Sequence, residues 1–473
     1  MQSKRDIADW LDEHQLRFTR MSDEIWDNPE LQFLEFKASK LQADFLAADG
    51  FRITWDLGGL STAFAAEWGT AAPVIAFAGE YDALPGLSQK DQNERDAIQA
   101  GAPGHGCGHN LLGTGCLAAA VAVKEWLQST GRAGTVRYYG CPAEEGGSGK
   151  VFMGRAGAFD DLDAIFNWHP WYINSAMKGS LLSVNRYYFR FHGKSAHAAA
   201  DPHSGRSALD ALELMNIGVN YLREHVPDDV RLHYSILSGG LAPNVVPDFA
   251  ESYYYVRAYE ADTLEDVSQR VIRIAQGAAM MTDTDVKVVY KSGSTRVLSN
   301  ETLADLQYEV MRELGGIDFT DEEQAYAAAI NGRFGDANVK TLINRYGVDP
   351  LTAERALIGD VLPSRDKDFV SPGSSDMGDM SWYAPCSMLQ TATWASRAAA
   401  HSWGVVATGR TSIGHKGMLY AAKVMALAAA ELVASPAVLA RAQAEFRAAV
   451  ERTPYKCPIP DDVPAPSHEH PLR

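Results

Sequence analysis

The sequence predicts an α/β protein of two domains, one of which interrupts the other. Three observations carry this prediction. With 473 residues, the chain is longer than a single hydrophobic core normally serves. Up to about residue 180 it alternates short apolar strands with helices, which is typical of a layered α/β domain. From about residue 181 the expected element order becomes β-α-β-β-α-β, and this is the order of a ferredoxin-like unit.

Apolar residues at helical spacing and short apolar runs define the elements of the first part. Residues 5–27 show the helical spacing, and Gly50 ends a second helix. The expected elements are helices at 5–27 and 35–48, strands at 51–57, 61–68 and 73–79, a helix at 111–128, a strand at 135–140, a helix at 150–157 and a strand at 163–168.

The rest of the chain holds the predicted insertion and the return to the first domain. We assign residues 181–290 to the inserted domain, and residues 1–180 and 291–473 to the domain that it interrupts. The insertion is expected to contain strand 181–191, helix 204–225, strands 230–237 and 250–258, helix 262–281 and strand 285–290. Beyond it we expect helices and loops at 317–372, a strand near 388–394, helices at 415–434 and 436–451, and a surface tail from Pro454.

The composition disfavours several classes of partner. A net charge of -17 argues against nucleic acids and anionic membranes. The N-terminus has no apolar signal segment, and no run reaches the roughly 20 apolar residues of a membrane span. Five cysteines do not form a disulfide framework in a chain of this length, so a reducing cytoplasm is the expected location.

Metal-ligand residue types collect at the ends of the predicted strands. A glycine-rich loop places Cys107 and His109 on backbone that few bulky side chains obstruct, and borderline transition metals favour thiolate and imidazole. Glu144 and Glu145 follow one predicted strand, and His169 ends the next. In open α/β sheets this edge is where ligands bind. Adjacent carboxylates point in different directions on extended backbone, so one can bind a cation while the other faces water.

Two other interpretations compete for these segments. Residues 146–150 look faintly like a phosphate loop, but they lack its full spacing and follow two carboxylates, which would repel an anion. A cysteine hydrolase would pair Cys107 with His105 or His109. That interpretation leaves the paired glutamates and His169 without a role.

Further candidates lie in the insertion and near the end of the chain. His197 lies in a turn, Asn244 lies between two prolines, and Arg257 ends a predicted strand. Asn244 and Arg257 are candidates for a substrate carboxylate, but an ordinary turn and a surface cation explain them equally well. His401 and His415 flank the final helical region, and their spacing does not decide which of them reaches the metal site.

Five motifs occur in the order seen in the M20 family of metal-dependent amidohydrolases and peptidases. The chain resembles the aminoacylase-type branch of that family. Within the branch it is similar to the group that holds the B-type subunits of p-aminobenzoyl-glutamate hydrolase and the indole-acetyl-aspartate hydrolases. The resemblance covers nearly the whole chain, and its motifs are Gly104–Asn110, Pro142–Gly146, Trp168–Pro170, Gly193–Ala198 and Pro243–Pro247.

The resemblance implies a fold and a set of residue roles. The fold is a zinc-aminopeptidase-like αβα catalytic domain with an inserted ferredoxin-like α+β domain that acts as lid and dimerisation unit. Glu144 matches the general base, and Asp82 matches an aspartate that orients a ligand. His197 matches a histidine that, in family dimers, reaches into the partner's active site and polarises the scissile carbonyl. The matching metal ligands are Cys107, His109, Glu145, His169 and His401.

The implied activity is hydrolysis of the amide bond of N-acyl or N-aroyl amino acids. Two divalent ions per chain are expected; the thiolate favours Zn²⁺ and the resemblance favours Mn²⁺. We expect a homodimer through the inserted domain or pairing with a homologous subunit, and no nucleic acid or membrane partner. A subunit that works only with such a partner is the alternative. The chain departs from the branch at Asn110 and Leu112, where the branch usually has Asp and His.

Overall fold

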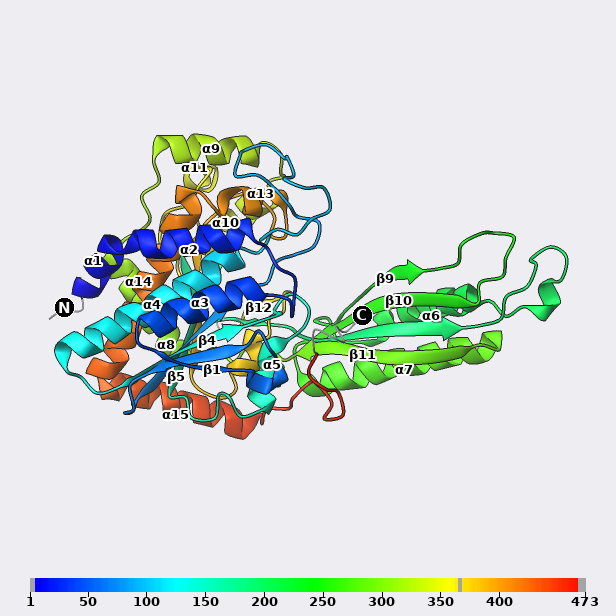
Figure 1. Ribbon diagram of the computed structural model, residues 1–473. Helices are drawn as coiled ribbons and strands as arrows, with labels where there is room; N and C mark the ends of the chain where they lie inside the picture. Colours follow the sequence, from blue (N-terminus) through cyan, green and yellow to red (C-terminus); the bar gives the residue numbers. More distant parts are fainter. Residues whose placement is uncertain (1–4, 365–367, 467–473) are drawn as a thin grey trace.

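The computed structural model describes residues 5–364 and 368–466. It shows a layered α/β body from which an elongated α+β unit extends to one side (Figure 1). The predicted fold class, an αβα domain with an inserted ferredoxin-like unit, is therefore confirmed.

A seven-stranded mixed sheet organises the layered body. Its central strands are parallel neighbours, and the outer strands are antiparallel. The central strands are nearly continuous apolar runs because both of their faces are covered. In sheet order the strands are β1 (Arg52–Trp55), β2 (Phe64–Trp68), β4 (Thr135–Cys141), β3 (Val74–Glu80), β5 (Ala164–Trp171), β13 (Cys386–Ala392) and β6 (Ser175–Met177).

Alternate side chains of the strands face two separate cores, so the sheet is the middle layer of a sandwich. Phe77 and Phe166 pack into the first core, whereas Ala76, Ala78 and Ile165 face the second. The helices that contribute to the first core are α1 (Arg5–Glu13), α2 (Gln15–Asp27), α3 (Phe36–Ala48), α4 (His109–Thr130), α8 (Glu301–Leu314), α14 (Ser412–Ala434) and α15 (Pro436–Arg452). Those of the second core are α5 (Gly149–Arg155) and α12 (Met377–Met380).

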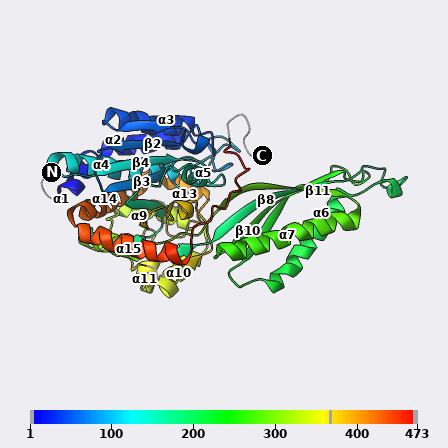
Figure 2. The ribbon, with the colours of Figure 1, turned by 90° about the horizontal axis from the view of Figure 1, so that it is seen from below.

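The elongated unit is a four-stranded antiparallel sheet with two helices on one face (Figure 2). The sheet order β11-β8-β10-β9 is that of a ferredoxin-like fold. Phe189 and Tyr254 pack beneath the helices, so the alternate residues, among them Arg186 and Tyr255, belong to the other face. The elements are β8 (Ser183–His192), α6 (Ala208–Leu222), β9 (Arg231–Ser238), β10 (Phe249–Ala258), α7 (Ala261–Thr282) and β11 (Asp285–Ser294). The domain boundaries at 181 and 290 stay a prediction.

The polar segment at 317–372 has a small core of its own. Residues 365–367 of this segment lie outside the described residues. Its elements are α9 (Asp321–Asn331), α10 (Ala337–Tyr346), α11 (Pro350–Ala353) and β12 (Val370–Ser371), which pairs with β7 (Ser180–Leu181); α13 (Trp403–Thr408) packs against it.

The structure differs from the expected elements at both ends of the chain. The expected helix at 5–27 is divided at His14, whose ring hydrogen-bonds the carbonyl of Trp10. The tail does not only follow the surface, because Ile459 is buried in the second core and the Tyr455 hydroxyl donates to Asp379. Helices α8 and α12 and strand β6 are additions to the expected set.

Helix α14 is long and apolar enough to cross a membrane, contrary to the expectation that no segment is. However, 72% of its most apolar window is buried inside the protein. It packs against α4, α1 and α8, and this packing accounts for its apolar character.

Candidate metal centre

The candidate site lies where the loops after the central strands meet. Because these strands are parallel neighbours, their carboxyl ends share one edge of the sheet. The residues that converge there are Asp82 after β3, Glu144 and Glu145 after β4, His169 on β5, His401 after β13, and Cys107 and His109 at the start of α4.

Two contacts join four of these side chains. Sγ of Cys107 lies 3.4 Å from Nε2 of His169, and Nε2 of His401 lies 3.4 Å from Oε2 of Glu145. The sulfur belongs to two groups whose ligand atoms all lie within 4.8 Å of one another. These groups are Cys107 with His109 and His169, and Cys107 with Glu145 and His401.

His109 lies between three acidic side chains. Its Nε2 is 3.3 Å from Glu80 and 4.0 Å from Glu144, and these three residues form a third compact group. Its Nδ1 lies 2.8 Å from Oδ1 of Asp82, whose Oδ2 accepts a hydrogen bond from the backbone of Glu145. Asp82 therefore contacts the imidazole of His109 and the backbone of Glu145 at the same time, as carboxylates behind metal ligands commonly do.

The residues present fit a divalent transition-metal ion. Nε2 of His109 and Oε1 of Glu145 are buried and have no hydrogen-bond partner. Orphaned buried polar atoms are rare and costly in native proteins. Each atom belongs to a residue of a separate compact ligand group that shares the sulfur of Cys107, so a cation in each group would satisfy it. Thiolate, imidazole and carboxylate are the ligands that zinc and manganese accept.

The carboxylates of the site repel one another. Burial first, and then the charge of Glu80, raise the pKa of Glu144 to about 7. Burial also raises the pKa of Glu80 above the ordinary glutamate value. It raises the pKa of Glu145 well above that value. A divalent cation would offset this concentration of negative charge.

The surroundings of Cys107 do not favour a free thiolate nucleophile. Burial, followed by the charge of Glu145, raises the pKa of the Cys107 thiol well above its ordinary value. Reactive cysteines lie instead in electropositive, partly exposed positions. The neighbouring His169 is suited to metal binding, because burial and the charge of His109 lower its pKa to about 3 and keep the ring neutral.

Three residues at the site have left-handed backbone conformations. The loop that carries the paired glutamates begins after Ala143 (φ 60°) and ends at Ser148 (φ 59°), and His401 has φ 58°. Such conformations cost about 1–3 kcal/mol in residues other than glycine and persist only where the surroundings impose them. The backbone amide of His401 donates to Gly106, which links it to the loop of Cys107.

Glu35 also positions the glutamate loop, and sequence reasoning missed it. Its Oε1 accepts hydrogen bonds from the backbone amides of Phe33 and Ala143, and its Oε2 accepts one from Thr62. The side chain is fully buried. Nothing in the local sequence distinguishes this glutamate from a solvated acid that precedes a helix.

A buried ion triad lies behind the site and was likewise not predicted. Nζ of Lys150 lies 2.7 Å from Glu80 and 2.5 Å from Asp376, and all three side chains are almost completely buried. Residues 146–150 therefore do not form a phosphate loop, since the lysine is already bound by two carboxylates.

The predicted residues of the inserted unit fall at its two opposite ends. Asn244 and His197 lie together at the far end, where Ala198 donates its amide to the carbonyl of Asn244. Arg257 pairs with Val184 at the beginning of β8. A ten-residue strand spans roughly 30 Å, so one chain does not bring Asn244 and Arg257 to the same carboxylate.

Two other histidines point elsewhere. Nε2 of His415 lies 2.8 Å from Asp23, so His401 rather than His415 joins the site. His105 is buried, and its Nε2 lies 3.2 Å from the carbonyl oxygen of Ile25.

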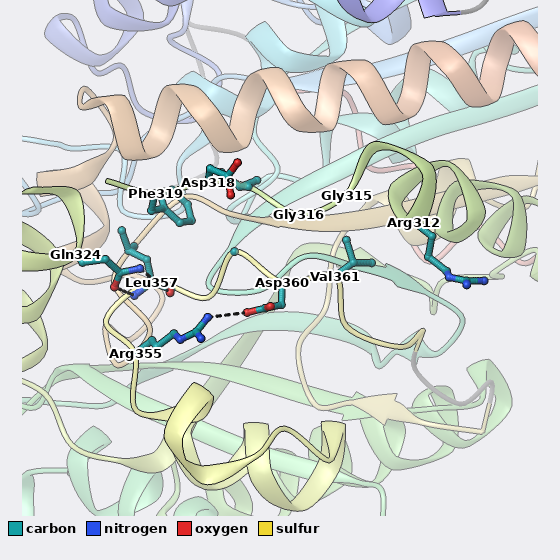
Figure 3. Close-up of a pocket in the computed structure, with 12 residues that line it drawn as sticks. Arg312, Gly315, Gly316, Asp318, Phe319, Gln324, Arg355, Leu357, Asp360 and Val361 are labelled. Atoms are coloured by element: carbon teal, nitrogen blue, oxygen red, sulfur yellow. Dashed lines mark hydrogen bonds and ion pairs between the residues drawn. The ribbon is translucent and has the colours of Figure 1, made fainter. Parts of the chain in front are cut away.

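A separate pocket of about 460 Å³ lies beside the end of α8, and its ion pair joins Arg355 to Asp360 (Figure 3). None of the predicted site residues lines it.

Comparisons with known proteins find relatives along most of the chain. The family model described as "Peptidase family M20/M25/M40" matches residues 76–356. The B-type subunit of p-aminobenzoyl-glutamate hydrolase from Escherichia coli (strain K12) is 41% identical over 98% of this chain and 98% of its own length. The Xaa-Arg dipeptidase of Mus musculus is 32% identical over 71% of this chain and 76% of its own length.

A solved structure shares the fold. It is the dinuclear metal-binding peptidase of the M20 family from Bacillus subtilis, with a TM-score of 0.55 and 20% identity, covering 88% of this chain and 98% of that chain.

Proposed function

Since this chain belongs to peptidase family M20/M25/M40, we propose that it cleaves N-aroyl amino acids of the p-aminobenzoyl-glutamate or indole-acetyl-aspartate type. The chain is a metal-dependent hydrolase of the amide bond of N-acyl amino acids. The observation that carries the metal chemistry is the convergence of one thiol, three imidazoles and three glutamates around buried atoms that lack partners. The substrate class is proposed from the 41% identity to the B-type subunit of p-aminobenzoyl-glutamate hydrolase.

Cys107, His109, Glu145, His169 and His401 would hold the metal. We propose two divalent ions, Mn²⁺ or Zn²⁺, because the ligand atoms form more than one compact group and the B. subtilis structure is named dinuclear. When bound, the metal supplies a Lewis acid that activates water and stabilises negative charge on oxygen.

Glu144 is the proposed general base. Its carboxylate lies at the edge of the ligand group, 4.0 Å from His109, and its pKa of about 7 is suited to proton exchange near neutral pH. Glu144 accepts the proton of the attacking water and passes it to the nitrogen of the leaving amino acid. The scissile C–N bond then breaks, and a carboxylate and a free amine leave.

His197 and Asn244 would serve the site of a second chain. Both lie at the far end of the inserted unit, which suits a homodimer through that unit, or pairing with a homologous subunit. There His197 would donate to the oxyanion of the tetrahedral intermediate, and Asn244 would contact the substrate carboxylate. Arg257 would contact the same carboxylate, but from the chain that supplies the metal ligands.

The acyl group would lie near Trp171. This ring is 6.0 Å from the ring of His169 and 5.5 Å from that of Trp394, whereas Trp168 is completely buried and bonds the carbonyl of Leu112. We propose a cytoplasmic location, which suits the five free cysteines.

Metal analysis and a substrate panel test the proposal. We expect metal bound to the purified protein, loss of activity with chelator, and cleavage of aromatic acyl-glutamates and acyl-aspartates. If activity survives chelation but is lost on alkylation of thiols, the metal-dependent mechanism is wrong and the protein is a cysteine hydrolase.

A second candidate is a subunit that works only with a homologous partner. The E. coli relative is named as one subunit of its hydrolase, and another relative, from Haemophilus influenzae, is named as a homologue of the A-type subunit. Activity of this chain alone would exclude that candidate.

A further inference from the structure

Arg186 is a buried cation next to the loop that carries the paired glutamates. It lies on β8, and only 5% of its surface is exposed. Its Nη1 donates to the hydroxyls of Ser148 and Ser292, at 3.3 and 3.2 Å. Ser292 in turn donates to the carbonyl of Gly146 at 2.8 Å. The guanidinium is therefore held directly behind the candidate catalytic loop.

The hydrogen bonds of Arg186 are incomplete. Its Nε is buried and has no hydrogen-bond partner. A guanidinium presents its N–H groups as a planar fork that matches a carboxylate. An unpaired edge in a buried arginine is thus suited to an anionic ligand.

The positive charge at this position is not balanced within the chain. In the part of the chain that the structure describes, no carboxylate forms an ion pair with Arg186 or Arg257. By contrast, Arg190 on the same strand pairs with Glu251. A buried charge without a counter-ion is costly.

Arg186 and Arg257 are close neighbours. Their guanidinium carbons lie 5.0 and 5.5 Å from the centre of the Tyr255 ring. Burial, followed by the charge of Arg186, lowers the pKa of Arg257 below its ordinary value. The same two causes lower the pKa of Lys291 to about 8. Nη1 of Arg257 donates to the hydroxyl of Ser374, which belongs to the layered body, at 3.0 Å. Two cations thus face the junction between the two units.

We propose that Arg186 and Arg257 form a paired anion subsite that binds an acidic leaving amino acid through its two carboxylates. Arg257 binds the α-carboxylate, and Arg186 binds the side-chain carboxylate of glutamate or aspartate. A neutral side chain would leave Arg186 buried and unpaired, so the enzyme discriminates against it. This inference rests on the proposed function and names the residue that determines its substrate class.

The test compares p-aminobenzoyl-L-glutamate with p-aminobenzoyl-L-glutamine, which have the same shape but differ in the side-chain charge. We expect the metal-loaded wild-type protein to prefer the glutamate substrate by at least about 100-fold in kcat/KM. Arg186→Gln should reduce this preference to within about 5-fold, mainly by slowing the glutamate substrate, and Arg186→Lys should restore part of it. Arg190→Gln is the matched control and should retain the wild-type preference.

The outcomes separate the two proposals. If the wild-type protein cleaves neither substrate nor any other N-aroyl amino acid, the proposed function fails. If it cleaves both without preference, or if Arg186→Gln slows both equally, only the anion subsite is overturned. Product inhibition of the wild-type protein gives a readout that needs no variant: free glutamate should inhibit at least about 10-fold better than glutamine, and equal inhibition would contradict the subsite.

Discussion

Glu144 and Glu145 are adjacent in sequence but contact different groups. Glu145 faces His401 and the sulfur of Cys107, whereas Glu144 faces His109. Both residues lie in a turn after β4, not on the extended backbone that we expected, and their side chains still leave it toward different groups. In the proposed mechanism Glu145 holds the metal and Glu144 transfers the proton.

Replacing Glu144 by glutamine should remove the base without removing a ligand. We expect kcat to fall by about 10²–10⁴-fold while the metal content stays at the wild-type level. Elemental analysis and steady-state kinetics on the same preparation check both parts. A near-normal rate would show that another group accepts the proton.

Replacing Asp82 by asparagine should weaken metal binding, because Asp82 orients His109 and the backbone of Glu145. Loss of such a partner typically costs about 10–100-fold in metal affinity. Chelator competition measures the change. An unchanged metal affinity would mean that the ring of His109 is held by other contacts.

At the scale of elements, the loop between β4 and α5 depends on partners from distant segments. Glu35, which precedes α3, fixes one end through the amide of Ala143, and Arg186 on β8 contacts the other end at Ser148. Both contacts lie at residues with left-handed conformations, Ala143 and Ser148, and the amides of Gly147 and Ser148 also donate to the carbonyl of Ala143 within the loop. The loop is accordingly held both by its own backbone hydrogen bonds and by partners from distant segments.

Glu35 should make stability depend on pH in the metal-free protein. Burial, followed by the charge of Asp82, raises its pKa from 4.5 to about 8. A carboxyl whose pKa is higher in the folded chain stabilises the fold below its unfolded pKa, and that contribution is lost as pH rises through the folded pKa. We expect the free energy of unfolding to decline between pH 4.5 and 8.

Glu35→Gln should make this decline shallower, because the amide does not ionise, while the raised carboxyl groups of the metal site still contribute. Chemical denaturation of the metal-free protein across that pH range is the measurement. Glu30→Gln, which alters a more exposed acid that binds the amides of Lys37 and Ala38, is the control and should leave the slope unchanged. Parallel curves for Glu35→Gln and wild type would contradict the assignment.

At the scale of the whole molecule, the inserted unit separates residues that the proposed reaction needs together. His197 follows β8 and Asn244 precedes β10, at the end of the inserted unit that lies away from the layered body, and the metal-ligand residues belong to that body. Figure 1 shows the inserted unit extending away from the layered body. The proposed active site assembled from two chains would account for the length of this unit and for the polar residues at its end.

Two inactive variants should therefore complement each other. In a mixed dimer of His197→Ala and Glu144→Gln, one site receives Glu144 from one chain and His197 from the other. Co-refolded or co-expressed mixtures should recover roughly a quarter of wild-type activity if the chains pair at random in a two-fold dimer. Mixtures that stay as inactive as the separate variants would contradict a shared site.

Much of the architecture was predictable because local patterns report it. The apolar runs of β3, β4 and β5 and the periodicity of α4 indicated a covered parallel sheet, and the carboxyl ends of that sheet indicated where ligands collect. Helix α8 was not predicted, because it lies between the inserted unit and the polar segment at 317–372, where we assigned no element. The break at His14 is a local departure that helical spacing does not reveal.

By itself, the sequence determined the layered α/β class, the ferredoxin-like insertion and the set of ligand-type residues, because periodicity and residue chemistry are local properties. Only the tertiary structure decided that Glu35 and Lys150 are buried behind the site and that Arg186 and Arg257 pack on the same ring, whereas the family resemblance had already favoured His401 over His415. Burial and charge pairing depend on segments up to hundreds of residues apart, and no local pattern encodes which of them meet.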